Sequence, residues 1–307
     1  MNSGIISDSS LSGGLDLQAT LESGQTYLWD RDDGNDYVDS GLSGGTSWYS
    51  AIIDGNVIRV RQIGGKLEWE SNAEVEGTIR RVLGLNDDLN EIMKENLKDP
   101  LVDAAYTKYK GMRIVRDPFF ACVVSFICSS QMRVERIFRM QQKLRREYGE
   151  KIRFEGKEYY EYPKPSKLAS LKESNLRKMG FGYRAPYVIE TAKILEKNEM
   201  CTSYILEDYE QNRSKLTELK GVGEKVADCI CLFSIGHLEA VPLDTWIRST
   251  IKIHYPSCYH KSYQDTSKSI RNKFGPYAGY VQTYIFHYLR HEAGMTGNIE
   301  SIDKRNK

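Results

Sequence analysis

The chain has 307 residues, of which 40% are hydrophobic and 28% are charged, and its formal net charge is +1. This length allows two or three domains with their own cores, and the composition is typical of a soluble globular protein. No apolar run approaches the roughly 18 residues of a membrane span, and residues 1–10 lack the features of a signal peptide, so we expect an intracellular protein without membrane contact.

The first hundred residues are predicted to form mainly strands and turns. Asp54-Gly55 and Gly64-Gly65 are typical of tight hairpin turns between antiparallel strands. Aromatic and β-branched residues predict the strands themselves, at Gln25–Trp29, Trp48–Ile53, Asn56–Ile63 and Lys66–Glu70.

From Val75 onward the apolar spacing becomes helical. Helices are predicted at Val75–Leu83, Asp88–Lys94, Pro100–Tyr109, Phe119–Cys128, Met132–Tyr148, Pro165–Ser170, Asn175–Met179, Ala185–Lys197, Tyr204–Asn212, Trp246–Ile253, Ser262–Phe274 and Tyr277–His291. We therefore predict an α+β fold, with an N-terminal antiparallel β-sheet domain over residues 1–105 and an all-helical core over residues 106–307.

Charge is segregated along the chain although the net charge is close to zero. Residues 1–40 contain eight acidic side chains against the single Arg31. Residues 131–148 contain six basic side chains against two acidic ones: Arg133, Arg136, Arg139, Lys143, Arg145 and Arg146. A basic helix face is usually only solvated, but such a cluster also suits a nucleic-acid backbone.

A helix–hairpin–helix unit is predicted at residues 214–233. Gly221 and Gly223 permit a tight reversal with positive φ, and a helical apolar pattern restarts at Val226. Lys225 then lies in the first turn of the second helix. The exposed N–H groups of the hairpin and the positive helix end suit a phosphate group.

Lys225 and Asp244 form a candidate catalytic pair. The positive helix end disfavours an ammonium, so Lys225 is a candidate amine nucleophile for Schiff-base chemistry. Asp244 follows Pro242-Leu243 and precedes an apolar-periodic run, as a helix N-cap does. Either residue alone is more often a solvated lysine or a simple cap, whereas their joint spacing around the hairpin favours catalysis.

The segments GVGEKVADCICL and AVPLD closely resemble the motif of the helix–hairpin–helix DNA glycosylases, and in detail the 8-oxoguanine DNA glycosylases. The resemblance implies that Lys225 is the catalytic lysine, Asp244 the catalytic aspartate and Cys229 the cysteine beside the lesion. It also implies that the helical part is the glycosylase core, and that Gly221, Gly223 and Trp246 lie at DNA phosphates.

The same resemblance implies a lesion pocket with three further residues. Ser23-Gly24-Gln25 corresponds to the segment whose glycine carbonyl accepts the N7–H of 8-oxoguanine, a hydrogen that guanine lacks. Gln282 would bond the pairing edge of the lesion, and Phe286 would stack on it. The alternatives are a turn glycine at Gly24 and a core aromatic at Phe286.

Four residues are implied to contact the partner base or to act as a wedge: Gln131, Arg136, Tyr183 and Arg184. Two positions depart from the family pattern. Gln131 stands where the family has asparagine, and its side chain is one methylene longer, so its contact with the partner cytosine is expected to differ. Trp246 stands where a histidine is usual.

The resemblance implies a bifunctional DNA glycosylase and abasic-site lyase that acts as a monomer. The implied substrate is duplex DNA with 8-oxoguanine opposite cytosine. The implied location is the intracellular compartment that contains the DNA. No iron–sulfur cluster or other cofactor is expected, because no cysteine follows Cys258. The resemblance allows one bound ion, a monovalent or hydrated divalent cation held by the hairpin carbonyls of Leu219–Val222. The alternatives are a non-enzymatic helix–hairpin–helix DNA-binding protein, and a glycosylase for another oxidised purine such as a formamidopyrimidine.

Overall fold

The computed structural model describes residues 1–33, 43–197 and 205–296, with the backbone alone for 293–296. Asp36 and Asp39 of the acidic N-terminal region lie outside the described residues, as does the first residue of the helix predicted at Tyr204–Asn212. Within the described part of the chain, no helix has the length and hydropathy needed to cross a membrane.

The N-terminal part is built on a five-stranded antiparallel sheet with the strand order β1-β5-β4-β3-β2. Its strands are β1 (Asn2–Ser7), β2 (Asp30–Arg31), β3 (Tyr49–Ile53), β4 (Asn56–Ile63) and β5 (Lys66–Ser71). Both predicted hairpins are present. Asp54 and Gly55, and likewise Gly64 and Gly65, all have φ between 52° and 75°, as the two-residue turns that match strand twist require.

The prediction of a strand at Gln25–Trp29 is wrong. This segment forms no ladder and is buried without strand pairing, with Gln25 and Trp29 each 1% exposed. Its β-branched and aromatic residues fill the space between the sheet and the helices. Strand β1 and the short, fully buried helix α1 (Leu17–Glu22) were not predicted.

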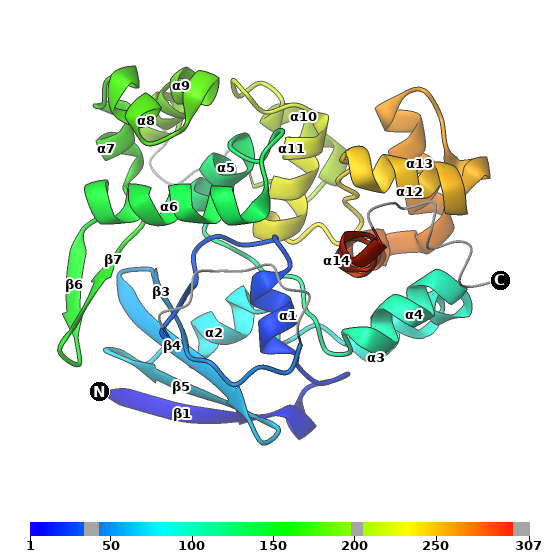
Figure 1. Ribbon diagram of the computed structural model, residues 1–307, viewed down its shortest axis with the longest axis horizontal. Helices are drawn as coiled ribbons and strands as arrows, with labels where there is room; N and C mark the ends of the chain where they lie inside the picture. The colour runs from blue at the N-terminus through cyan, green and yellow to red at the C-terminus, as the bar shows by residue number, and fades with distance from the viewer. Residues whose placement is uncertain (34–42, 198–204, 297–307) are drawn as a thin grey trace.

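The remaining chain is mainly helical (Figure 1). Its helices are α2 (Glu76–Val82), α3 (Leu89–Lys94), α4 (Pro100–Lys108), α5 (Phe119–Ile127), α6 (Val134–Tyr148), α7 (Pro165–Ala169), α8 (Glu173–Lys178), α9 (Ala185–Lys197), α10 (Tyr209–Leu216), α11 (Glu224–Ile230), α12 (Thr245–His254), α13 (Tyr263–Phe274) and α14 (Ala278–Thr296). A second, unpredicted hairpin, β6 (Lys151–Phe154) and β7 (Lys157–Tyr160), follows α6. Helix α4 spans position 105, at which the sequence analysis divides the chain.

Two hydrophobic cores meet at α1. Leu17 and Leu21 pack into the core beside the sheet, whereas Ala19 belongs to the larger helical core. In Figure 1, α1 lies between the sheet below and the helices above. The segment that follows α1, residues 23–25, is therefore placed where the two cores join.

Candidate active site

One pocket collects the predicted catalytic pair and all four predicted lesion residues. Its lining comes from the segment after α1, from α5 and α11, from the start of α12 and from α14. The lining residues are Ser23, Gly24, Gln25, Phe126, Lys225, Cys229, Phe233, Pro242, Asp244, Gln282, Thr283 and Phe286. The structure thus brings together residues more than 260 positions apart in the sequence, from Ser23 to Phe286. The role of each toward a substrate stays a prediction.

The hairpin before the pocket differs from the expectation at one glycine. Gly221 has φ 81°, and a Cβ at this position would come within 2.8 Å of Tyr187, so only glycine fits without a shift. Gly223 has φ −90° and ψ −178°, which any residue can adopt, so the prediction of positive φ is wrong there. Gly223 is the N-cap of α11, and Lys225 lies in the first turn as predicted.

Lys225 is half-buried at the pocket wall. Its Nζ donates a hydrogen bond to Oγ of Ser129 at 3.2 Å and lies 5.4 Å from the ring centroid of Phe126. One turn further along α11, burial raises the pKa of Cys229 to about 11, although the nearby Lys225 lowers it. The Cys229 thiol is therefore neutral at pH 7 and does not hold the lysine in an ion pair.

Asp244 caps α12 and lines the pocket at the same time. Its Oδ1 accepts a hydrogen bond from the backbone N–H of Ile247 at 2.8 Å, which confirms the predicted N-cap. The cap fixes the direction of the carboxylate. The cap and the catalytic interpretation, which the sequence analysis set against each other, are thus compatible.

A buried network fixes α11 relative to the start of α12. Asp228 lies one turn after Lys225 and is fully buried, where it accepts hydrogen bonds from the hydroxyls of Tyr209 and Tyr263, both at 2.6 Å. Burial raises the pKa of Asp228 to about 6, although the ion pair with Arg213 lowers it. The Tyr263 oxygen also accepts from the N–H of Leu243 at 3.0 Å, directly before Asp244. The elements that carry the candidate amine and carboxylate are therefore joined by side-chain hydrogen bonds.

Gln282 and Phe286 face the pocket one turn apart on α14. Gln282 is 8% exposed, and its Oε1 is buried with no hydrogen-bond partner among the described residues. A buried acceptor without a donor costs free energy, so it indicates a place where a ligand can donate. The half-buried Phe286 ring lies 5.7 Å from the guanidinium carbon of Arg290.

Gly24 is held in place by its neighbour Gln25. Gly24 has φ 86°, and a Cβ there would lie 3.0 Å from Val134. The Gln25 Nε2 donates to the carbonyl oxygens of Thr20 at 2.9 Å and Arg113 at 2.8 Å. Thr20, Gln25 and Arg113 are all buried, so these hydrogen bonds help to fix the backbone next to Gly24.

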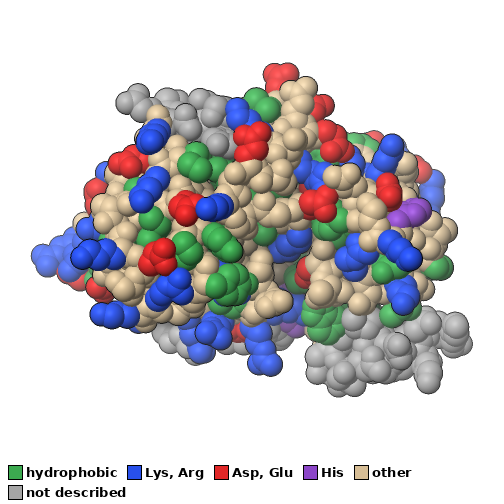
Figure 2. Space-filling model, turned by 90° about the horizontal axis from the view of Figure 1, so that it is seen from above, with side chains coloured by type: hydrophobic (Ala, Val, Ile, Leu, Met, Phe, Trp, Pro, Cys, Tyr) green, Lys and Arg blue, Asp and Glu red, His purple; other side chains and the backbone are tan. Residues whose placement is uncertain are grey.

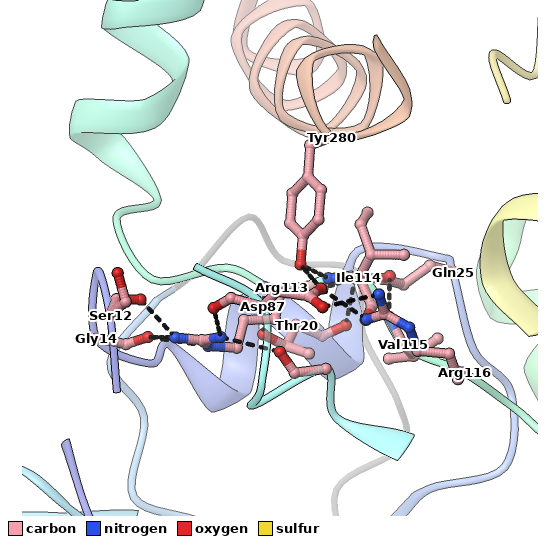
Figure 3. Close-up of polar contacts among 11 residues, drawn as sticks. Ser12, Gly14, Thr20, Gln25, Asp87, Arg113, Ile114, Val115, Arg116 and Tyr280 are labelled. Atoms are coloured by element: carbon pink, nitrogen blue, oxygen red, sulfur yellow. Dashed lines mark hydrogen bonds and ion pairs between the residues drawn. The ribbon is translucent and has the colours of Figure 1, made fainter. Parts of the chain in front are cut away.

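The segment Met112–Arg116, which we call the strap, joins this glycine segment to α14 (Figure 3). Its Val115 N–H donates to Oε1 of Gln25 at 2.9 Å. On the other side, the Ile114 N–H donates to the hydroxyl of Tyr280 at 3.2 Å, and the hydroxyl of Tyr284 donates to the Met112 carbonyl at 2.7 Å. Tyr280 and Tyr284 flank Gln282 on α14, so the strap sets the distance between the two walls of the pocket.

The strap is itself anchored by two arginines. Arg113 is fully buried, and its guanidinium donates to the carbonyl oxygens of Ser12, Gly14, Gly84 and Asp87. Arg116 forms an ion pair with Asp87 at 2.7 Å. Figure 3 shows both guanidinium groups lying in the loops between the sheet domain and α14.

The four predicted partner-base and wedge residues have different environments. Gln131 is exposed with φ 53°, in the left-handed region, and Arg136 is exposed in the first turn of α6. Tyr183 is 51% exposed. Arg184 is only 6% exposed, and its Nη2 donates to the carbonyl of Ser130. Arg184 therefore braces the turn before Gln131, and its other guanidinium N–H groups are the donors left for a base.

The remaining predicted positions lie on the surface around the hairpin. Gly221 and Gly223 are exposed, and Trp246 is 39% exposed in the first turn of α12. In the described part of the chain, no group of three or more His, Cys, Asp or Glu side chains could hold a metal ion.

Sequence reasoning missed Ser129 and Tyr263 as parts of the site. Ser129 lies two residues before the predicted Gln131, but nothing in the sequence shows its bond to Lys225. Tyr263 gave no signal, because its contacts with Asp228 and Leu243 exist only in the folded chain.

Comparisons with known proteins identify the family of the chain. Residues 124–276 match the family model of the HhH-GPD superfamily base excision DNA repair proteins. Residues 9–123 match the 8-oxoguanine DNA glycosylase N-terminal domain. The chain belongs to the HhH-GPD superfamily, which confirms the resemblance.

Individual relatives show which members of the superfamily this chain resembles. The chain is 33% identical over 217 residues to a probable N-glycosylase/DNA lyase of Methanothermobacter thermautotrophicus, covering 63% of this chain and 68% of the relative. It is 28% identical to N-glycosylase/DNA lyase OGG1 of Arabidopsis thaliana, covering 89% and 76%. The structure matches the Clostridium acetobutylicum 8-oxoguanine glycosylase/lyase, in complex with duplex DNA containing cytosine opposite 8-oxoguanine, with a TM-score of 0.79 and 28% identity, covering 91% and 92%.

Proposed function

We propose that this protein is a bifunctional DNA glycosylase and abasic-site lyase that excises 8-oxoguanine from duplex DNA. The observation that carries this proposal is the single pocket in which Lys225 and Asp244 face Gly24, Gln282 and Phe286. A protein that only gripped phosphates would need no such pocket, and the relatives named above are glycosylases and lyases.

The reaction needs the base outside the helical stack, which costs a few kcal/mol of unstacking and unpairing. The lone pair of the Lys225 amine attacks C1′ of the deoxyribose, and the N-glycosidic bond breaks as the base leaves. The Asp244 carboxylate stabilises the positive charge that develops on the sugar. The sugar ring then opens to a Schiff base on Lys225, and loss of a C2′ proton breaks the C3′–O bond and nicks the strand.

The proposed recognition of the lesion depends on the hydrogen bonds that a base can form with the polar groups of the pocket. The unpaired Gln282 Oε1 can accept a hydrogen bond from the pairing edge of a purine, and Phe286 can stack on its face. The Gly24 carbonyl can accept N7–H from 8-oxoguanine, whereas guanine would place a lone pair against it. Such a mismatch leaves a buried acceptor unpaired, which is a strong source of selectivity.

On the partner strand, we infer that cytosine is read by Arg136 and Arg184 while Gln131 and Tyr183 fill the vacated space. Exposure of Gln131, Arg136 and Tyr183 on neighbouring segments supports this. We further propose that the protein acts as a monomer. We also propose that it resides in the cellular compartment that contains the DNA.

We also propose that the hairpin carbonyls of Leu219–Val222 bind a monovalent or hydrated divalent cation. The Leu219 carbonyl accepts from the Val222 N–H, and the Lys220 carbonyl accepts from the Thr191 hydroxyl. Because a carbonyl oxygen has two lone pairs, each of them keeps one for a cation or its water.

Single-turnover base release tests the proposed substrate. Duplexes would carry 8-oxoguanine opposite each of the four bases, a formamidopyrimidine opposite cytosine, or an undamaged G·C pair. We expect the fastest release from 8-oxoguanine opposite cytosine and none from G·C. Faster release of the formamidopyrimidine would move the assignment to that lesion, and no release from any duplex would refute the proposal.

A further inference from the structure

The outer face of α6 carries four exposed basic residues, Arg136, Arg139, Lys143 and Arg146, which we call the α6 stripe. Their spacing of three, four and three residues places them on one side of the helix. Arg136, Lys143 and Arg146 form no ion pair with any carboxylate among the described residues. The stripe spans about 15 Å along the helix axis, at 1.5 Å per residue.

The opposite face of α6 fixes this orientation. Ile137, Phe138 and Leu144 are buried in the helical core. Arg145 also points inward, where it donates to the Leu28 carbonyl at 2.6 Å and pairs with Asp30 at 2.6 Å. The helix therefore cannot rotate to bury its stripe.

The carboxylates of α6 do not neutralise the stripe. Glu135 lies 3.8 Å from Arg290, and Glu147 directly follows the last basic residue without an ion pair among the described residues. Several exposed arginines elsewhere are paired, as in Arg81–Asp54, Arg153–Glu158 and Arg177–Glu173. Figure 2 shows the molecule from above, with Lys and Arg side chains gathered along its lower edge from the left end toward the centre. Helix α6 occupies the same horizontal stretch in Figure 1.

The stripe begins beside the pocket. Helix α6 starts three residues after Gln131. The turn before the helix contains Ser129, which accepts the hydrogen bond from Lys225. Phosphates of one DNA strand repeat about every 3.4 Å along the helix axis. A stripe of about 15 Å that starts at the flipped base can therefore follow several consecutive phosphates.

We propose that Arg139, Lys143 and Arg146 of the α6 stripe bind the phosphates of one duplex arm beside the lesion, while Arg136, at the pocket end of the stripe, makes the base contact already assigned to it. The proposal rests on the proposed function for the position of the lesion. Regularly spaced cations without interleaved apolar groups match a phosphate backbone, which contributes affinity without sequence information.

The salt dependence of binding tests the stripe. We would compare wild type with the double variant Lys143→Gln/Arg146→Gln on lesion and undamaged duplexes over a series of salt concentrations. Each lost phosphate contact lowers the slope of log K against log salt by about 1, so we expect a slope smaller by about 2. Both duplexes should be weakened equally, because phosphate contacts carry no information about the base.

Two controls separate contact from overall charge. The double variant Lys94→Gln/Lys98→Gln removes the same charge from exposed positions in and after α3, which do not line the pocket, and should leave the slope unchanged. The exchange Lys143→Arg/Arg146→Lys keeps both charges and should keep the wild-type slope.

Shortening the duplex locates the contact. Removal of one arm should abolish the difference between wild type and Lys143→Gln/Arg146→Gln, while removal of the other arm should preserve it. An unchanged slope in that variant, or an equal change in the α3 control, would overturn the stripe proposal. Base release and lysine trapping in the wild type are measured separately, so failure of the proposed function is distinguishable.

Discussion

At the scale of single residues, Asp244 combines two roles that can be separated by substitution. Its Oδ1 accepts the Ile247 N–H and so caps α12, while its position in the pocket gives a negative charge near Lys225. Asparagine caps a helix about as well as aspartate but carries no charge. The Asp244→Asn variant therefore removes the charge and keeps the fold.

We predict that Asp244→Asn slows single-turnover base release by about 10²-fold, the effect of losing one electrostatic group at a transition state. Its melting temperature should stay close to that of the wild type because the cap remains. The variant Asp244→Ser, which also caps, should be equally slow. A wild-type rate in Asp244→Asn would reduce this residue to a helix cap.

At the scale of elements, the strap holds the two walls of the lesion pocket at a fixed separation. Gln25 fastens it to the glycine segment, and Tyr280 and Tyr284 fasten it to α14. The Gly24 carbonyl can discriminate N7–H from N7 only if its position is fixed to a fraction of an ångström. Gln25 is thus a positioning residue that need not contact the base.

We predict that Gln25→Met lowers the selectivity for 8-oxoguanine over guanine, measured as the ratio of single-turnover release rates. The loss of buried hydrogen bonds should also lower the free energy of unfolding by about 1–3 kcal/mol. Tyr255→Phe is the control, because it removes the part-buried hydrogen bond from Tyr255 to Asp99 and does not alter the pocket lining. Equal loss of selectivity in both variants would mean that general destabilisation, not the strap, is responsible.

Most helices and strands, and the positions of the candidate catalytic pair, could be predicted from the sequence because their signals are local. Turn glycines marked the hairpins of the sheet, and the spacing around Gly221 located Lys225 and Asp244. The Gln25–Trp29 segment could not be predicted, because its β-forming residues are buried by tertiary packing rather than strand pairing. The burial of Arg184 could not be predicted either, because its hydrogen bond to Ser130 joins segments more than fifty residues apart.

At the scale of the whole molecule, a buried carboxyl lies where the two cores join. Asp117 precedes α5 and is 4% exposed, and it accepts a hydrogen bond from the hydroxyl of Thr26 at 3.1 Å. Burial raises the pKa of Asp117 from 3.8 to about 7, although the Thr26 hydrogen bond and the more distant Arg145 lower it. Because the folded state binds this proton more tightly than the unfolded chain, its contribution to stability is present below about pH 4 and is lost as the pH rises toward 7.

We therefore predict that Asp117→Asn, which is neutral at every pH, stabilises the protein relative to wild type more at about pH 8 than at about pH 5. Urea unfolding of both proteins at the two pH values measures this difference. Asp103→Asn, on the exposed face of α4, should behave like the wild type. A difference between Asp117→Asn and wild type that does not depend on pH would show that Asp117 is not protonated in the folded state.

The covalent trapping of Lys225 tests the central claim most directly. Borohydride reduces a Schiff base to a stable amine, so a lesion duplex becomes linked to the enzyme only if the base has been released and an amine of the enzyme has formed a Schiff base at C1′. We predict a trapped complex with the wild type and with Lys220→Gln, a control at the neighbouring hairpin lysine. Lys225→Gln should bind the lesion duplex but give no trapped complex. Trapping by Lys225→Gln, or its absence in a wild type that binds the duplex, would contradict the account.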